Sequence, residues 1–357
     1  MDAFRVGLAI PLQGPGGIFG PSCEKVADLA IAQLNQRAGI LGRPVDVEVL
    51  DAGASLEQFC DSTAAAVAAG RIHAVVGWHI SSVRQHMAPV LAGLGVPYVY
   101  TSLHEGAGQE AVLCPGETPS LQVAPGLSWL REHLGIRRWS VVGADYVWPR
   151  RTLRAIRAYA RATGLDIVHE QFVRYGCRDF RGVLRDVRGS SAQGVIMLLV
   201  GRDAVLFNRQ FAAGGLQDGL VRFSPLMEEN MLLASGAGAT RDLYVAAAYF
   251  NSLVTSSAID FTGSYADRFG PGAPALNNAA ESCYEGILAL AAAASAVGSA
   301  DPARMLAAIE ERGVTYDGPR GTVRLGAGSS YQQVHIARAE DYEFDVLGPL
   351  AQDTLAG

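Results

Sequence analysis

The feature that most constrains the fold of this chain is a regular alternation of short apolar runs with longer segments of helical period. The runs are rich in Val, Ile and Tyr, and apolar residues in the longer segments recur every three or four positions. This pattern is typical of βαβ units and predicts an α/β fold with mostly parallel sheets. Strands are expected at 4–11, 45–50, 73–77, 97–100, 139–143, 167–172, 195–200, 222–225 and 244–249, and helices at 21–37, 55–69, 82–94, 126–134, 149–162, 180–187 and 204–213.

The later part of the chain departs from this alternation. A loop rich in Gly and Pro at 106–125 indicates a crossing between domains. The 357 residues suffice for two globular units of roughly 100 to 200 residues each. Because the chain ends in strands rather than helices, we expect discontinuous domains that it visits more than once. Helices are predicted at 264–269, 277–297 and 302–312, and strands at 322–325, 333–339 and 344–347.

Charge and composition exclude several classes of protein. The net charge of −6 argues against a nucleic-acid partner, which would need a basic face. Lys25 is the only lysine and follows no glycine loop, so the phosphate-binding GxxxxGK[ST] motif is absent. The longest nearly uncharged stretch, Gly286–Ala300, is shorter than the ~20 residues that span a bilayer. We therefore predict no membrane span.

The first loop, Gly14–Gly20, stands where a dinucleotide fingerprint would lie, with Asp51 downstream. Starting from Gly14, GxGxxG requires a glycine at the position of Phe19. We interpret the loop as a glycine-rich lip beside a ligand cleft and predict no cofactor.

Motifs of enzymes and metal sites are also absent. The chain has no GxSxG elbow, HExxH pair or CxxC pair. We predict a protein that is not an enzyme and holds no metal, although a triad of distant residues is recognised only by geometry. Its five cysteines are expected to be buried free thiols, while one bridge such as Cys23–Cys60 stays open.

The N-terminus enters an apolar run at once and lacks the charged start and cleavage site of a secretory signal. Read literally, it predicts a cytoplasmic protein. An exported protein whose signal segment was replaced by a Met would have the same sequence, so a periplasmic or cell-surface location stays open.

Three segments that follow apolar strands combine polar and aromatic residues: Gly77–Ser82, Tyr98–Ser102 and Asp145–Arg150. Ligands of open parallel sheets bind at the carboxyl ends of strands, so we expect these segments at a ligand site. Two alternatives stay open: Ser81 or Ser82 caps the next helix, and each aromatic residue packs in a core.

The third of these segments leads into a predicted helix. Pro149 is well placed as the first helical residue, which leaves Tyr146 and Trp148 on the preceding loop. Flat rings with one hydrogen-bonding atom suit contact with a small polar molecule.

The chain resembles the type I periplasmic binding proteins of the leucine/isoleucine/valine-binding family, and within them most closely the amide sensor of bacterial aliphatic amidase and the urea and short-chain amide binders. The resemblance implies two α/β lobes, each a mostly parallel sheet flanked by helices, joined by three crossovers and closing on a ligand. We expect lobe 1 at 1–121 and 251–327, and lobe 2 at 122–250 and 328–357. The segments that carry the resemblance follow the family order and are 6–12, 39–45, 75–81, 145–150, 280–284 and 317–324.

The resemblance also implies site residues. Ser81, Tyr100 and Ser102 fall where lobe 1 grips the carbonyl or carboxylate end of the ligand. Tyr146 and Trp148 fall where the amide sensor has two tyrosines, and tryptophan departs from that pattern because it donates without accepting.

Two further positions bear on the ligand. His79 stands at a position that resembles one where the amide sensor has an aromatic residue, and is a second departure from that pattern. Glu228, beside Glu229, is the candidate for the acid that amino-acid binders of the family need. A buried ammonium requires a paired charge, whereas an amide requires only hydrogen bonds. An acid at the site would favour an amino acid, and its absence would favour an amide or urea.

We predict a solute-binding protein that closes on a short-chain amide, urea or amino acid for an ABC-type uptake system, with an ABC permease as its partner. The alternative is a cytoplasmic amide sensor that reports its ligand to a regulatory protein of an amidase operon.

Overall fold

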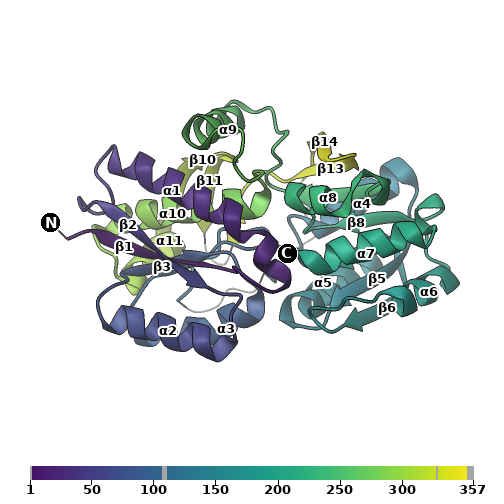
Figure 1. Cartoon of the computed structure of the whole chain (residues 1–357), viewed down its shortest axis with the longest axis horizontal. Helices are drawn as coiled ribbons and strands as arrows, with labels where there is room; N and C mark the ends of the chain where they lie inside the picture. The colour runs from purple at the N-terminus through teal and green to yellow at the C-terminus, as the bar shows by residue number, and fades with distance from the viewer. Residues whose placement is uncertain (1, 107–110, 327–328, 352–357) are drawn as a thin grey trace. The chain divides into compact units, whose positions relative to one another are not determined.

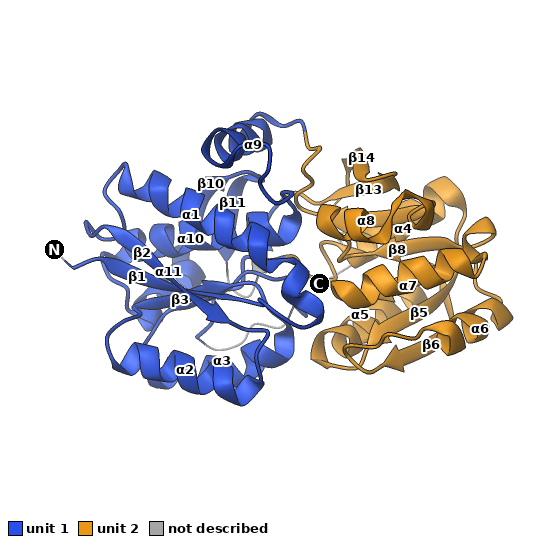
Figure 2. Cartoon of the chain, viewed as in Figure 1, with its two compact units in different colours: residues 1–116, 254–332 blue, residues 117–253, 333–357 orange. Residues whose placement is uncertain are grey.

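The computed structural model describes residues 2–106, 111–326 and 329–351. The chain forms two compact units: unit 1 comprises 1–116 and 254–332, and unit 2 comprises 117–253 and 333–357 (Figure 2). The chain therefore passes between the units after residues 116, 253 and 332. The crossings expected after 121 and 250 lie close to the first two of these, whereas the one expected after 327 lies outside the described residues, as does part of the loop at 106–125.

Unit 1 is organised around a four-stranded sheet in the order β2-β1-β3-β4 (Figure 1). Every ladder in this sheet is parallel, as the alternation predicts, because a helix separates each strand from the next along the chain. The elements are β1 Phe4–Ile10, α1 Gly20–Asn35, β2 Val45–Asp51, α2 Leu56–Ala68, β3 Ala74–Gly77, α3 Ser81–Gly93 and β4 Tyr98–Tyr100.

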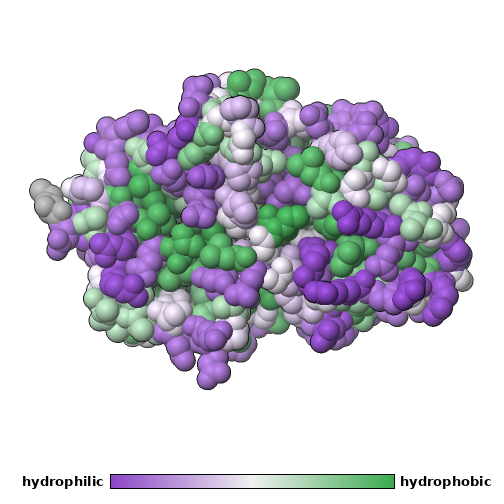
Figure 3. All heavy atoms as spheres, viewed as in Figure 1, coloured by the Kyte–Doolittle hydropathy of each residue, from purple (hydrophilic) through white to green (hydrophobic). Residues whose placement is uncertain are grey.

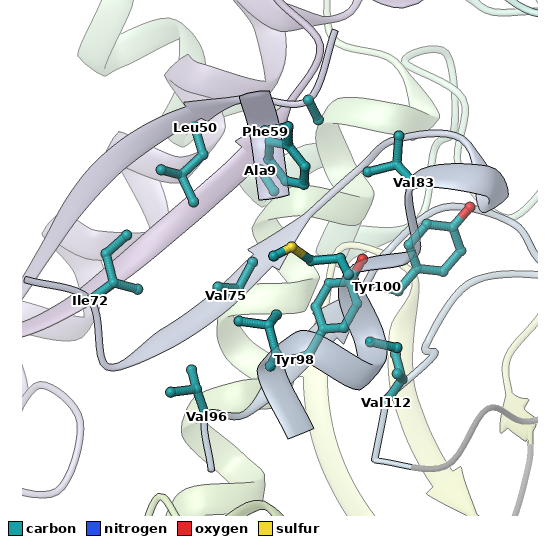
Figure 4. Close-up of a cluster of buried hydrophobic side chains, with 14 of the residues drawn as sticks. Ala9, Leu50, Phe59, Ile72, Val75, Val83, Val96, Tyr98, Tyr100 and Val112 are labelled. Carbon is teal, nitrogen blue, oxygen red and sulfur yellow. The ribbon is translucent and has the colours of Figure 1, made fainter. Parts of the chain in front are cut away.

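Different helices cover the two faces of this sheet. On one face, a buried cluster joins α2 and α3 to alternate residues of the strands, and includes Phe59, Met87 and Tyr98 (Figure 4). On the other face lies α10 (Asn278–Val297), which approaches so closely that a Cβ at Gly286 would be 2.3 Å from Thr101 Cγ2. This contact requires glycine, because any side chain there would displace the helix from the sheet.

The rest of unit 1 consists of α9 (Ser256–Phe269), α11 (Pro302–Arg312) and a three-stranded antiparallel sheet. That sheet has the order β10-β11-β12, with β10 at Val314–Gly318, β11 at Gly321–Gly326 and β12 at Ser329–Tyr331.

A buried polar cluster fastens this small sheet to α10. Arg320, between β10 and β11, donates to Glu281 Oε2 at 2.6 Å and to Gln332 Oε1 at 2.7 Å. Tyr316 donates to Glu285 Oε2 at 3.1 Å. Burial raises the pKa of Glu281 well above its ordinary value. The neighbouring Glu285 carboxyl adds to this rise, because the two buried carboxyl groups share the single guanidinium of Arg320.

Unit 2 contains a seven-stranded sheet in the order β14-β13-β9-β8-β7-β5-β6. The last five of these pair in parallel, and β13 and β14, from the C-terminal stretch, add antiparallel at one edge. The elements are α4 Val123–Leu134, β5 Arg138–Ala144, α5 Val147–Thr163, β6 Asp166–Val173, α6 Arg181–Gly189, β7 Gly194–Leu198, α7 Arg202–Ala213, β8 Val221–Ser224, α8 Glu229–Ser235, β9 Leu243–Ala247, β13 His335–Glu340 and β14 Glu343–Pro349.

Some elements differ from the prediction. The sequence analysis missed α8, β10 and β12, which are short and therefore carry few periods of any pattern. The helix expected from 264 begins at Ser256, where Thr255 caps it by accepting a hydrogen bond from Ala258 N. Gly263 lies inside this helix and weakens its sequence signal, since glycine is a poor helix former.

All five cysteines are free thiols, so the Cys23–Cys60 bridge that the spacing left open is not formed. Cys23 and Cys283 are buried, and the other three are half-buried. Among the described residues no single helix is long and apolar enough to cross a membrane, and the bent pair of α10 and α11 passes such a test only by length and composition. On the face that Figure 3 shows, hydrophilic and hydrophobic residues are interspersed in both units.

Candidate functional site

In unit 1, the predicted ligand-binding residues follow the adjacent strands β3 and β4. His79 and Ser81 come after β3, Tyr100 ends β4, and Ser102 lies two residues further on. All four side chains are buried. The parallel sheet therefore brings these predicted residues to one edge, and we refer to them as the unit 1 set.

Hydrogen bonds connect the unit 1 set internally. The Tyr100 hydroxyl donates to the His79 carbonyl at 2.8 Å and lies 3.5 Å from Ser81 Oγ. His79 Nε2 lies 2.8 Å from the Tyr98 hydroxyl, and Nδ1 lies 3.3 Å from the Ile80 carbonyl. A neutral ring protonated on Nδ1 satisfies both contacts. Burial lowers the pKa of His79 to about 4, which keeps the ring neutral near pH 7.

The ring of Tyr100 belongs to the hydrophobic cluster beneath α2 and α3, together with Tyr98, Val83 and Val112 (Figure 4). Burial raises the pKa of Tyr100 to about 12. Its ring thus packs in the core while its hydroxyl supports the backbone at His79. A direct contact of either residue with a ligand stays a prediction.

The sequence analysis missed a buried ion pair beside this set. Arg84 Nη2 lies 2.5 Å from Glu105 Oε2, and both side chains are only 1% exposed, so water screens the pair little. The Arg84 guanidinium stacks over the Tyr100 ring at 4.7 Å. Burial is the largest influence on the pKa of Glu105 and raises it, but the charge of Arg84 and the hydrogen bonds that Glu105 accepts from Ser81, Arg84 and the backbone together hold that pKa below its ordinary value. Arg84 lies three residues after Ser81 on α3, and residues three apart are neighbours on a helix surface. This spacing is the one local feature of the sequence that could have indicated that Arg84 lies near Ser81.

The structure excludes one alternative left open for Ser81 and corrects one predicted helix start. The N-cap of α3 is Ile80, and Ser81 is the first helical residue and caps nothing. Helix α5 begins at Val147 rather than Pro149, so Trp148 lies in its first turn and not on the preceding loop. Proline fits within a first turn because the N–H groups there lack partners inside the helix.

In unit 2, four adjacent strands end beside polar or aromatic residues. Strands β6, β5, β7 and β8 lead into Tyr175, Tyr146, Asp203 and Glu228, respectively. These strands neighbour one another in the sheet, so the residues share one edge. Together with Trp148 and Glu229 they form what we call the unit 2 set. Tyr175 and Asp203 were not predicted.

The aromatic members of the unit 2 set lie near one another. The Tyr146 ring centroid is 6.5 Å from that of Trp148 and 5.8 Å from that of Tyr175. Both tyrosines are half-buried. Trp148 is 2% exposed, and its Nε1 has no hydrogen-bond partner among the described residues. A buried indole N–H without an acceptor costs stability, which an acceptor on a ligand would recover.

The acidic members of the unit 2 set are buried. Asp203 Oδ2 accepts from Gly176 N at 2.7 Å, while Oδ1 has no partner within the described stretches. Glu229 Oε1 accepts from Asn251 N at 2.7 Å, and Glu228 is the N-cap residue of α8. Burial raises the pKa of Asp203 to about 6 and that of Glu229 to about 7.

In the glycine-rich loop of unit 1, Asp51 does not have the role that the acidic residue of a dinucleotide site has, which is to bind the ribose of the cofactor. Asp51 Oδ1 accepts from Leu12 N at 2.9 Å, so this carboxylate holds the loop itself. Phe19 is fully buried and packs on Trp78 with ring centroids 4.4 Å apart. Whether the loop borders a ligand stays a prediction.

The two sets offer hydrogen bonding and apolar contact. The unit 1 set contains two serine hydroxyls beside the hydrogen bonds of His79 and Tyr100. The unit 2 set contains aromatic rings, carboxyl groups and the Trp148 N–H, which has no acceptor among the described residues. In the part of the chain that the structure describes, no three His, Cys, Asp or Glu side chains are arranged to hold a metal ion. Each set, taken by itself, carries groups that suit contact with a small organic molecule.

Comparisons with known proteins agree with this architecture. A family model described as periplasmic binding protein matches residues 3–342. The Leu/Ile/Val-binding protein BraC3 of Rhizobium johnstonii is 24% identical over 217 residues, which cover 59% of this chain and 56% of that protein. The chain thus spans little more than half the length of the curated relatives it matches.

Solved structures extend the similarity over the whole chain. A solute-binding protein of an ABC transporter from R. palustris, in complex with benzoate, has a TM-score of 0.84 and 18% identity, covering 99% of this chain and 98% of that one. A leucine-binding protein, LivK, from Thermotoga maritima MSB8 has a TM-score of 0.85 and 18% identity, covering 99% and 100%. At these identities the likeness shows the fold, and it confirms the predicted two-lobed α/β class with mostly parallel sheets flanked by helices.

Proposed function

Because this chain belongs to the periplasmic binding protein family, we propose that it is a solute-binding protein of an ABC-type uptake system. It binds a small polar ligand without chemical turnover and presents it to a permease in the periplasm or at the cell surface. The observation that carries the proposal is the unit 2 set, where unpartnered polar atoms and aromatic rings share one sheet edge. The regulatory alternative gains no support from the relatives named above.

The carboxyl groups of the unit 2 set favour an amino acid as the ligand. Asp203, Glu228 and Glu229 are all buried at this edge. The pKa values of Asp203 and Glu229 are raised by burial, so a cation placed beside them would stabilise their charged forms. An ammonium group supplies that cation, whereas urea and short-chain amides supply only hydrogen-bond donors. Two relatives are named for branched-chain amino acids, and the benzoate complex represents another class.

We assign complementary roles to the two sets. Ser81 and Ser102 hydrogen-bond the carboxylate or carbonyl end of the ligand, helped by the unpaired N–H groups at the start of α3. Glu228 pairs with the ammonium group. Tyr146 and Trp148 cover the apolar part, and Trp148 Nε1 donates to a ligand oxygen.

A thermal-shift panel tests the ligand class. The full chain is heated with leucine, isoleucine, valine, polar and aromatic amino acids, acetamide, butyramide, urea and benzoate at millimolar concentration. A ligand at about 100 times its Kd adds about 2.7 kcal/mol to the stability of the folded state, so a binder is detected. A response to amino acids is expected. A rise in melting temperature with amides alone would show that Glu228 does not pair with the ligand. No rise with any compound of the panel would contradict the proposal.

A pair of tyrosine variants tests the site. Tyr146→Ala is expected to abolish the ligand-induced shift without lowering the melting temperature of the free protein by more than a few degrees. The matched control is Tyr342→Ala, which removes an exposed tyrosine of unit 2 from the turn between β13 and β14. Equal ligand shifts in both variants would overturn the assignment of Tyr146.

A further inference from the structure

The two units carry very different charge. Unit 1 has 11 basic and 18 acidic residues, whereas unit 2 has 18 basic residues, all arginine, and 17 acidic ones. In unit 2 the arginines concentrate on α5, which contains five of them and no acidic residue. This helix is therefore a strongly basic element in a protein of net negative charge.

Two of the α5 arginines have carboxylate partners. Arg150 Nε lies 2.8 Å from Asp145 Oδ1, and Arg157 Nε lies 2.8 Å from Glu170 Oε1. These pairs satisfy the side of the helix that faces β6 and the end of β5.

The other three arginines of α5 lack such partners. Arg151, Arg154 and Arg161 are exposed, and none has a carboxylate within ion-pair distance among the described residues. Three like charges on one helix repel one another and gain from a negative surface placed against them.

An apolar groove lies beside these three arginines. A cavity of about 280 Å³ lies between α4 and α5, and none of the described residues that line it is charged. Its walls include Val123, Ala124 and Leu127 of α4, and Ala155, Ala158 and Ala162 of α5.

The arginines border this groove by helical spacing. Arg154 and Arg161 lie four residues before and three residues after Ala158, and Arg151 lies four residues before Ala155. Residues three and four apart are neighbours on a helix surface, so the arginines form a basic rim along an apolar floor.

Two hydrogen bonds near one end of the groove fix α4 and α5 to each other. Tyr159 donates to Ser128 Oγ at 2.7 Å, and Arg131 Nη1 donates to the Thr163 carbonyl at 3.0 Å. These bonds join the C-terminal halves of α4 and α5. The groove is therefore a formed feature of unit 2 rather than one that a partner would have to create.

We propose that this groove docks an acidic amphipathic segment of a partner protein, with apolar side chains on the alanine floor and carboxylates on Arg151, Arg154 and Arg161. Charge complementarity favours this occupant, because a basic rim along the α5 wall of an apolar floor matches a helix that is apolar on one face and acidic beside that face. The inference does not depend on the identity of the small ligand, since none of the residues that line the groove belongs to the unit 2 set, although α5 also carries Trp148 in its first turn.

The experiment measures binding of a fluorescent 18-residue helical peptide with leucines on one face and glutamates along both edges. Two control peptides replace the glutamates by lysine or the leucines by serine. The rim variant is Arg151→Ala/Arg154→Ala/Arg161→Ala. The matched control is Arg181→Ala/Arg185→Ala/Arg188→Ala, which removes three arginines from α6 in the same unit.

The glutamate peptide is expected to bind the full chain, and the rim variant is expected to lose about tenfold in affinity while the α6 variant loses less than twofold. Ala158→Glu, which fills the floor with a negative charge, is expected to abolish binding. Both control peptides are expected to bind at least tenfold more weakly.

Other results would overturn the proposal. Failure of the glutamate peptide to bind, equal losses in the rim and α6 variants, or equal binding of the serine peptide would each show that the groove does not recognise an acidic amphipathic segment. Concentration-dependent self-association that Ala158→Glu abolishes would assign the groove to a second copy of this chain instead. The small-ligand thermal shift is expected to persist in every variant, so a failure here is distinguishable from a failure of the proposed function.

Discussion

The polar set of unit 1 and that of unit 2 stand at equivalent strand ends but differ in how far their hydrogen bonds are satisfied. In unit 1, His79 and Tyr100 use their polar atoms on one another and on neighbouring backbone. In unit 2, Trp148 Nε1 and Asp203 Oδ1 have no partner among the described residues. Buried polar groups are nearly always paired in native proteins, so the unpaired atoms mark where a ligand has most to offer. We therefore propose that Trp148 and Asp203 contact the ligand directly. In unit 1 the unpaired atoms lie beside the set, at Arg84 Nε, Arg84 Nη1 and Glu105 Oε1 of the buried ion pair, among the described residues.

The sets also differ in the sign of their response to pH. Unit 1 contains groups whose pKa values are lowered, namely His79 and Glu105. Unit 2 contains carboxyl groups whose pKa values are raised, namely Asp203 and Glu229. His79 and Glu105 therefore make the folded state less stable as the pH falls. Asp203 and Glu229 make the folded state without ligand less stable as the pH rises toward neutral.

The largest expected effect on stability comes from breaking the buried ion pair between Arg84 and Glu105 in unit 1. Arg84→Ala leaves Glu105 buried without its partner and is expected to lower the free energy of unfolding by about 3–5 kcal/mol. Urea denaturation measures this loss. Arg150→Ala, which breaks the exposed pair with Asp145, is the control and is expected to cost less than about 1 kcal/mol.

Replacing both partners sharpens the same test. Arg84→Leu/Glu105→Leu is expected to recover most of the loss, because no buried charge then lacks a partner. If Arg84→Ala and Arg150→Ala lowered the free energy of unfolding by similar amounts, the buried pair would contribute no more to stability than the exposed one.

The next effect concerns the acidic edge of unit 2. The pKa of Glu229 is about 7 in the folded state against an ordinary value of 4.5, so the folded state binds more protons between these values and stability falls as pH rises through them. Glu229→Gln is expected to remove this fall and to raise stability at pH 8 by up to about 3 kcal/mol. Denaturation at several pH values measures it, with exposed Glu343→Gln as the unaffected control.

The opposite slope is expected from His79 in unit 1. Its pKa is about 4 when folded and 6.5 ordinarily, so the unfolded state binds the proton first and stability falls as pH drops through this range. His79→Gln is expected to flatten the acid limb of the stability curve by about 2 kcal/mol or more, whatever its effect at pH 7. An unchanged limb, or an equal change in the exposed His86→Gln, would remove the contrast between the units.

The smallest effect on stability is expected at Trp148. Trp148→Phe keeps an aromatic ring and removes an N–H that has no partner among the residues the structure describes, so the free protein should change by less than about 1 kcal/mol. Ligand affinity should fall by about tenfold, because the donor to the ligand is lost. Calorimetric titration with the ligand found in the thermal-shift panel measures both quantities, and an unchanged affinity would place the indole outside the site.

Much of the fold followed from the sequence, and part of the site did. The alternation of strands and helices predicted nearly every element from β1 to β9, and it brought Ser81 and Tyr146 to strand ends. It missed the Arg84–Glu105 pair and the bond between Gly176 and Asp203. The partners in these contacts lie 21 and 27 residues apart, beyond the reach of any local pattern.

The sequence by itself determined the α/β class, because the period of apolar residues along a segment follows from which of its faces is buried. Only the tertiary structure decided which polar groups are satisfied. The Tyr100 hydroxyl has an acceptor at His79, whereas the Trp148 indole has none in the described parts of the chain. Tyr100 ends strand β4 and Trp148 lies just after β5, in the first turn of α5, and the sequence near either residue does not show whether its polar atom finds a partner. Burial and pairing are properties of the tertiary structure, whereas periodicity is a property of the segment.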